Sequence, residues 1–336
     1  MFQKNISLQS LNTFGIDALA EKFAAVDSVD QLSRIVAVHK DLFILSGGSN
    51  ILLTQDISTP VIHLVTKGIE YMNDPNDANT VIVKAQAGEN WHEFVLWCLS
   101  KNFGGLENLS LIPGNVGTSP MQNIGAYGVE IKDVFHELEA MEISSGKIRT
   151  FQPSDCKFGY RESVFKNDLK GQFIILNVSF KLSRSRHKIH ASYGAIQAIL
   201  QENKIEEPSI KDISDAVIAI RKTKLPDPKV IGNSGSFFKN PVISTDQFSQ
   251  LQKKFPEIPK YVISKTLVKV PAGWLVEQCG YKGKRYGDAG VHKHQALVLV
   301  NYDKASGTEI LNLAKEIQHT VSQKFNISLE VEVNII

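Results

Sequence analysis

Residues 113–128 read PGNVGTSPMQNIGAYG, and this stretch carries the strongest indication of what the chain folds to do. It holds four glycines and two prolines in sixteen residues, together with Asn115, Gln122 and Asn123. Glycine reaches positive φ and lets backbone N–H groups approach a ligand, and successive N–H groups form a nest for phosphate oxygens. Ordering so many polar groups costs conformational entropy unless a ligand pairs with them. The stretch therefore predicts a ligand-binding loop.

A second loop of the same character, residues 46–50 (SGGSN), follows the apolar strand expected at 42–45. Taken alone it is explained equally well by a tight turn, but with 113–128 it fits the chemistry of a pyrophosphate site. Neither loop contains the Gly-Lys-Ser/Thr of a P-loop, and neither matches G-x-G-x-x-G at the start of a helix. A kinase and a nicotinamide-binding Rossmann enzyme are therefore disfavoured.

Outward from these loops, the chain alternates strands and helices separated by turn residues. We expect helices at 28–40, 91–101, 209–222 and 305–325, strands at 42–45, 61–65, 81–87, 138–143, 147–151, 173–182, 297–301 and 327–333, and a hairpin turn at 144–146. Pro226 and Pro228 break the third helix, since proline fixes φ and lacks an N–H donor. We place a domain boundary near residue 220.

Composition narrows the class of partner. The chain has 336 residues, 43% of them hydrophobic, and a net charge of only +2, which offers no footprint for nucleic acid or anionic lipid. No segment has the length of apolar sequence that spans a bilayer, and the start lacks a signal-peptide pattern, so we expect a cytoplasmic protein. Three separated cysteines without a CxxC pair predict core thiols, and His292 and His294 have no third ligand in sequence, so we expect no metal.

Several segments in order along the chain resemble the UDP-N-acetylenolpyruvoylglucosamine reductase family. They are LSGGSN at 45–50, GLENL at 105–109, IPG at 112–114, QNIGAYG at 122–128, FGYR at 158–161, GNSGSFFKNP at 232–241 and LE at 329–330. The segment ASYG at 191–194 resembles the longer type of the family, which has an extra tyrosine loop over the substrate.

The resemblance implies an α+β protein with a two-lobed FAD-binding domain of the vanillyl-alcohol-oxidase (PCMH) type and a smaller α+β substrate-binding domain. We expect the FAD-binding domain at 1–219, with lobes at 1–68 and 69–219. The substrate-binding domain is expected at 220–324. A C-terminal strand at 325–336 carries Glu330 and is expected to return to the FAD-binding domain.

The resemblance also implies the reaction: NADPH reduces FAD, which passes hydride to the enolpyruvyl ether of a UDP-amino sugar and yields UDP-N-acetylmuramate for peptidoglycan. Negative charge then builds beside the ether and on the carboxylate, so cations, donors and one proton source are needed. Arg161 matches the residue that grips the carboxylate, Glu330 an acid held protonated as a donor, and Ser236 the proton donor, helped by Lys224 or Asn240. Alone, each is an ordinary surface or turn residue, and Glu332 shares a strand face with Glu330.

Further positions match the family's ligand contacts. The resemblance implies non-covalent FAD bound by Ser46, Gly47, Gly48, Ser49, Asn50, Pro113, Gly114, Gly117, Thr118, Ser119, Gln122, Asn123, Gly125, Ala126 and Tyr160. It implies a UDP-sugar bound by Tyr193, Lys224, Asn240, Lys282 and Gln295. Lysines suit a pyrophosphate as point charges, and a tyrosine face suits a nucleotide lid. A monomer is expected.

Two other readings stay open. A flavin oxidase of the same fold, acting on an alcohol or hydroxy acid, would be reoxidised rapidly by air. A flavin-bearing sensor or binding module would bind UDP-sugar without turnover. The segments around Ser236 and Glu330 argue against the oxidase, and a sensor or binding module would leave Arg161, Ser236 and Glu330 without a purpose.

Overall fold

The computed structural model describes residues 2–336, which divide into two compact units. Unit 1 comprises residues 2–6, 20–47 and 58–221, and unit 2 comprises residues 7–19, 48–57 and 222–336. These units differ from the expected ranges 1–219, 220–324 and 325–336. The early segments 7–19 and 48–57 group with the last third of the chain.

Unit 1 contains a four-stranded sheet in the order β1 (Gln3–Ser7), β2 (Leu19–Val26), β5 (Val61–Leu64) and β3 (Phe43–Leu45). Strands β2, β5 and β3 run parallel. Helix α1 (Val29–Val38) connects β2 to β3, and it buries Leu32 and Val36, one turn apart on one face. A core shared with strands of the second sheet covers this face.

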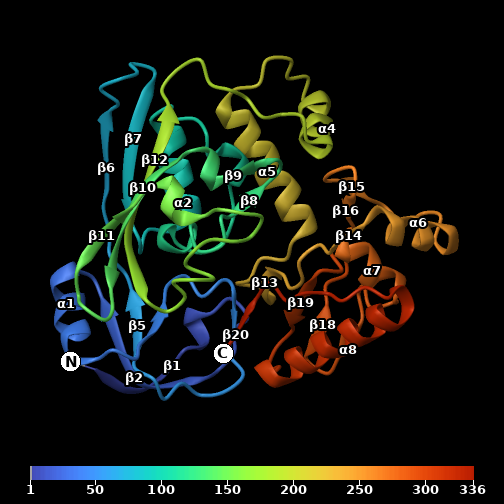
Figure 1. Ribbon diagram of the computed structural model, residues 1–336, viewed down its shortest axis with the longest axis horizontal. Helices are drawn as coiled ribbons and strands as arrows, with labels where there is room; N and C mark the ends of the chain where they lie inside the picture. Colours follow the sequence, from blue (N-terminus) through green and yellow to red (C-terminus); the bar gives the residue numbers. More distant parts are fainter. Residues whose placement is uncertain (1) are drawn as a thin grey trace. The chain divides into compact units, whose positions relative to one another are not determined.

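The second sheet of unit 1 is antiparallel, in the order β11 (Ile148–Phe151), β10 (Phe135–Glu142), β12 (Phe173–Ser183), β7 (Thr80–Gln86) and β6 (Ile69–Asn73). Figure 1 shows these long strands side by side with helix α2 (Trp91–Ser100) next to them. Asn90 caps α2 by accepting from Glu93 N at 3.0 Å. Trp91 and Phe94 of α2 and Phe180 of β12 form the centre of this core.

Short elements complete unit 1. They are the 3-10 helices η2 (Glu107–Leu109), η3 (Val116–Thr118) and η4 (Ile131–Asp133), the pair β8 (Gly125–Ala126) and β9 (Val129–Glu130), and helices α3 (Pro153–Cys156), α4 (Gly194–Glu202) and α5 (Ile210–Lys224), of which α5 runs on into unit 2. Helices α4 and α5 share their own small apolar core.

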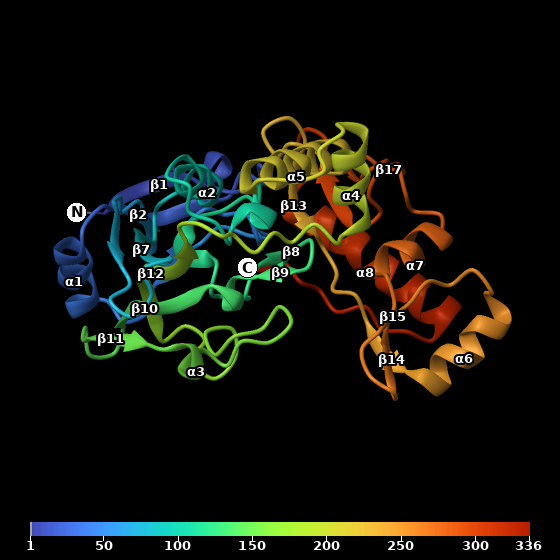
Figure 2. The same ribbon diagram turned by 90° about the horizontal axis from the view of Figure 1, so that it is seen from above.

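Unit 2 is built on a sheet in the order β13 (Gly232–Ser236), β19 (Val298–Asn301), β18 (Ala289–Val291) and β17 (Arg285–Tyr286). Helix α8 (Gly307–Phe325), opened by a Ser306–Glu309 capping box, packs on β18, β19 and α7 (Ala272–Gln278), and Figure 2 shows α7 and α8 side by side. A smaller sheet, β14 (Val242–Ser244), β16 (Leu267–Lys269) and β15 (Tyr261–Val262), lies with α6 (Thr245–Lys254).

The early segments of unit 2 are held by direct backbone contacts. Strand β4 (Ile51–Leu52) pairs in parallel with β20 (Asn334–Ile335), and Thr54 N donates to Ile336 O at 2.8 Å. A Cβ on Gly307 would lie 1.8 Å from Leu53 O, so this approach requires glycine. Unit 2 is therefore continuous in space although it is discontinuous in sequence.

The four expected helices and most of the expected strands are confirmed within a few residues. The strand expected at 327–333 is wrong in its bounds: Val331 makes an isolated bridge to Phe238, and the ladder begins only at Asn334. Among residues 2–336, no helix combines the length and the apolar character needed to cross a membrane.

Candidate active site

Ser46 and Gly47, the start of the first glycine-rich loop, lie with the second glycine-rich loop in unit 1, whereas residues 48–50 belong to unit 2. A Cβ on Gly47 would lie 2.6 Å from Gly114 Cα, so the backbones of the two loops touch. A Cβ on Gly117 would lie 2.5 Å from Ala87 Cβ at the end of β7. Only glycine permits these two approaches without displacing backbone, and the loops are thereby fixed against each other.

The loops fit a cofactor that carries a pyrophosphate. The hydroxyl of Ser46 is buried and has no hydrogen-bond partner among the described residues, which is costly unless a ligand supplies one. The hydroxyls of Thr118 and Ser119 instead donate to Asn115 O and Val116 O, both at 2.7 Å, and so brace their own loop. Glycine lets backbone N–H groups approach a bound group closely. The cradle therefore fits FAD through Ser46 and the glycine backbone.

Asn123, expected to contact FAD, uses its whole side chain inside the protein. It is fully buried at φ 44°. Its Nδ2 donates to Glu130 Oε2 at 3.1 Å and to Gly159 O at 3.0 Å, and its Oδ1 accepts from Lys132 N at 3.1 Å. The side chain thus joins the loop at 122–130 to the turn that precedes Arg161.

Arg161 lies on that turn in a left-handed conformation, φ 58°. Its Nη2 donates to Gly125 O at 2.7 Å, and its guanidinium lies 5.6 Å from the ring centre of Tyr160. The main chain closes around it, because Gly159 and Glu162 exchange hydrogen bonds across the turn. Arginine at a positive φ is uncommon, and such positions persist where the surroundings determine them.

Arg221 stands near Arg161 and was not predicted from the sequence. Its Nε donates to Leu111 O at 3.1 Å, and its side chain hydrogen-bonds Tyr127. Burial lowers the pKa of Arg221; the Tyr127 hydroxyl opposes this shift, and the charge of Arg161 adds to it. Among residues 2–336, no carboxylate acts on Arg221. Two cations are therefore held close together, which favours an anionic ligand.

Tyr127 links this pair of arginines to the expected lid. Its ring meets that of Tyr193 edge to face, with centroids 5.2 Å apart, and burial raises the pKa of its hydroxyl. Tyr193 precedes α4 and remains 45% exposed. The expected substrate residue Tyr193 and the expected catalytic residue Arg161 thus both border the Tyr127–Arg221 pair.

Two features of the sequence point to Arg221 and Tyr127, which were not predicted. Arg221 follows the apolar stripe of α5, four residues after the buried Val217, and a cation there must find a partner. Tyr127 lies inside the glycine-rich stretch itself.

Ser236 and Glu330 lie in unit 2, on neighbouring segments. Ser236 pairs with Val298 at the end of β13. The three residues that follow Ser236 pair with 330–332: Glu332 N donates to Phe237 O at 2.8 Å, and Lys239 N donates to Glu330 O at 2.9 Å. Lys239 Nζ lies 2.5 Å from Glu330 Oε1. The carboxyl group expected to be a donor is thus part of an ion pair.

The remaining expected substrate residues are spread over unit 2. Lys224 ends α5, and Asn240 Oδ1 accepts from Ala272 N at 2.9 Å at the start of α7. Lys282 pairs with Glu277 at 2.8 Å. Gln295 Oε1 accepts from Leu297 N at 3.4 Å. Within the described residues, no direct contact joins any two of Lys224, Asn240, Lys282 and Gln295.

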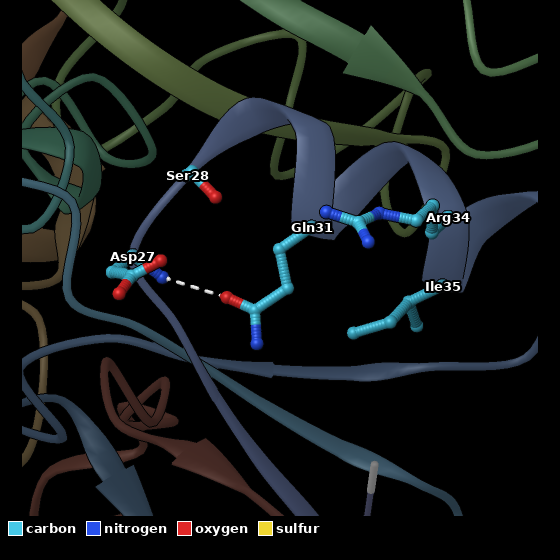
Figure 3. Close-up of a pocket in the computed structure, with 5 residues that line it drawn as sticks. All are labelled: Asp27, Ser28, Gln31, Arg34 and Ile35. Carbon is cyan, nitrogen blue, oxygen red and sulfur yellow. Dashed lines mark hydrogen bonds between the residues drawn. The ribbon is translucent and has the colours of Figure 1, made fainter.

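A hollow in unit 1 lies away from all of these residues. It opens where α1 begins and is lined by Asp27, Ser28, Gln31, Arg34 and Ile35, with Asp27 N donating to Gln31 Oε1 at 3.2 Å (Figure 3). No predicted site residue lines it. Within residues 2–336, no group of three or more His, Cys, Asp or Glu side chains is placed to hold a metal ion.

Comparison with known proteins agrees with the family resemblance that the sequence motifs indicated. Residues 20–152 match the family model described as FAD binding domain, and residues 227–336 match UDP-N-acetylenolpyruvoylglucosamine reductase, C-terminal domain. The chain is 59% identical to UDP-N-acetylenolpyruvoylglucosamine reductase of Flavobacterium johnsoniae, covering 99% of both chains. It is 48% identical to the protein of the same name from Pseudomonas syringae pv. syringae, covering 99% of this chain and 98% of that one.

A solved structure also resembles it. The crystal structure of UDP-N-acetylenolpyruvylglucosamine reductase from Thermus caldophilus aligns with a TM-score of 0.67 at 22% identity, over 100% of this chain and 99% of that one. At this identity the likeness concerns the fold, and it agrees with the expected α+β architecture.

Proposed function

This chain belongs to the UDP-N-acetylenolpyruvoylglucosamine reductase family, and we propose from that premise how its residues carry out the family's reaction. The chain is an FAD-dependent oxidoreductase of peptidoglycan precursor synthesis. It reduces the enolpyruvyl ether of UDP-N-acetylglucosamine enolpyruvate, and the product is the lactyl ether UDP-N-acetylmuramate. FAD, when bound, supplies the hydride chemistry that no side chain offers, with NADPH as the proposed electron source.

Ser46, Gly47 and Gly114 are the residues we propose to hold the pyrophosphate of FAD. The unpartnered Ser46 hydroxyl and the glycine contact between the two loops support this assignment. Backbone N–H groups and a hydroxyl then replace the water that solvates the phosphates.

Arg161 and Arg221 are proposed to bind the charge that the reaction creates. Reduction at the terminal carbon of the enolpyruvyl group builds negative charge on the next carbon and its carboxylate. Cations fixed beforehand stabilise that charge without reorganising. The observation that carries this proposal is Arg221, partly buried beside Arg161 with no carboxylate acting on it among the described residues.

Ser236 is proposed to donate the proton that completes the reduction. Its hydroxyl lies at the end of β13, directly before the segment that pairs with Glu330. The proton moves from Ser236 Oγ to the carbon bearing the negative charge, and solvent restores it. Glu330 is proposed to be held protonated and to donate a hydrogen bond to the enolate-like carboxylate oxygen of the same intermediate.

The test separates the two halves of the reaction under anaerobic conditions. Purified protein should show flavin absorbance that bleaches with NADPH and recovers with UDP-N-acetylglucosamine enolpyruvate. Ser236→Ala should bleach at the wild-type rate and recover about a hundredfold more slowly, the size of a lost general acid. Ser249→Ala, which removes a hydroxyl bonded to its own helix, is the matched control.

Other outcomes point to other functions. Fast recovery in air without the sugar would favour a flavin oxidase, and binding of the sugar without recovery would favour a sensor. Wild-type protein that takes up no FAD would overturn the assignment of both loops. We also propose that the enzyme works in the cytoplasm as a monomer without nucleic-acid or membrane partners.

A further inference from the structure

We propose that Lys239 is a positioning residue that fixes the carboxylate of Glu330 for the reaction; this rests on the function proposed above. Lys239 Nζ lies 2.5 Å from Glu330 Oε1, and Lys239 N donates to Glu330 O at 2.9 Å. The two residues are thus joined through both side chain and main chain.

The two partners differ in how firmly they are held. The side chain of Lys239 is 10% exposed and that of Glu330 is 68% exposed. Lys239 follows Phe237 and Phe238, which are 0% and 1% exposed and pack edge to face against each other, with Phe237 also meeting Phe14. A buried anchor therefore holds the lysine, and the lysine in turn restricts a glutamate that is otherwise free to change rotamer.

The same short ladder carries Ser236. Phe237 N donates to Leu297 O, and Phe238 bridges Val331, so the segment is fixed on both sides. Ser236 and Lys239 are three residues apart on it. A shift of Lys239 would move the carboxylate of Glu330 relative to Ser236, whereas the intact pair keeps both groups in one frame.

The ion pair also leaves a defined oxygen for the substrate. Lys239 contacts Oε1, so Oε2 is the oxygen that can carry the proton that Glu330 is expected to donate. Because Glu330 is proposed to act on the intermediate formed from the sugar, we expect Lys239 to affect the step that uses the sugar and not the reduction of FAD by NADPH.

The test is Lys239→Met in the flavin-containing enzyme, with the two half-reactions followed separately by stopped flow. Reduction by NADPH should stay within about twofold of wild type, while reoxidation by UDP-N-acetylglucosamine enolpyruvate should slow on the order of tenfold, which corresponds to about 1.4 kcal/mol in the barrier. Lys239→Arg should recover most of the rate. Lys211→Met, which removes an exposed lysine paired with Asp215, is the matched control.

A double-mutant cycle decides whether Lys239 acts through Glu330. Lys239→Met should add nothing to Glu330→Gln, since the target of the lysine is already altered. Reoxidation of Lys239→Met at the wild-type rate, or a full tenfold loss on top of Glu330→Gln, would overturn the proposal. If Lys239→Met folds poorly by circular dichroism and flavin content, Glu330→Asp tests the same pair, because its carboxylate cannot both keep Lys239 and reach the substrate. Wild-type enzyme that fails to be reoxidised by the sugar would refute the proposed function instead.

Discussion

Replacing Asn123 by alanine should destabilise unit 1 far more than the loss of one polar side chain in a loop usually does. The side chain makes three hydrogen bonds, to Glu130, Gly159 and Lys132, and it is fully buried. Each bond contributes about 1 kcal/mol net. Alanine also tolerates the left-handed φ of 44° less well than asparagine, at about 1 kcal/mol. We expect a loss of roughly 4 kcal/mol in the free energy of unfolding.

Thermal unfolding followed by circular dichroism measures this loss. At about 3 °C per kcal/mol for a unit of this size, the midpoint should fall by roughly 12 °C. Asn5→Ala is the matched control, because Asn5 has φ 53° but is exposed, so only the backbone part should be lost. Asn123→Gly removes the backbone strain but still loses the three hydrogen bonds. Its midpoint should therefore lie between those of Asn123→Ala and Asn5→Ala. A midpoint for Asn123→Ala no lower than that of Asn5→Ala would refute the reasoning.

Three further outcomes follow from particular contacts. Gly47→Ala should purify without flavin, because a Cβ at 47 meets the Gly114 backbone at 2.6 Å. Gly146→Ala, which meets nothing within 4 Å and carries only the backbone strain of its φ of 71°, should keep the flavin. Retained flavin absorbance in Gly47→Ala would contradict the loop contact. Burial raises the pKa of all three thiols, to about 12 for Cys156, but Cys98 and Cys156 are buried and Cys279 is partly exposed. Native protein should therefore react with a thiol reagent first at Cys279, and stability should fall above pH 9, where the unfolded chain loses these protons before the native protein does. Burial lowers the pKa of His292, so as the pH falls the unfolded chain binds this proton before the native protein does. The stability of the wild type should therefore decrease below about pH 6.5. The decrease should be less steep in His292→Gln, as measured by urea unfolding at a series of pH values.

Local pattern predicted the helices because the responsible interactions are local. The buried positions of α1, Leu32 and Val36, are one helical turn apart, and the glycines of 113–128 announce a ligand without reference to distant residues. The bounds of the closing strand were wrong because its partner is the two-residue strand β4, which has no periodicity to read.

The working parts of the site were harder to foresee, because their partners lie far along the chain. Asn123 bonds to Gly159, 36 residues away, and Arg221 to Leu111, 110 residues away. Asn123 therefore reads in sequence as one more ligand-facing amide, although its groups are all used internally. Lys239 and Glu330 are 91 residues apart, and nothing in the sequence of either announces an ion pair.

The pairing of β4 with β20 has a consequence for how the protein is made. Thr54 and Ile336 are 282 residues apart, so residues 48–57 leave the ribosome long before their partners exist. During most of translation the strand edge of this segment has no partner, and the backbone at Leu53, which Gly307 later contacts, is uncovered. Unit 2 can close only after residues 334–335 have been synthesised, whereas all of unit 1 has been synthesised once residue 221 has emerged. A nascent chain should therefore fold unit 1 first and hold the early segment of unit 2 open, which is a natural place for a chaperone to bind.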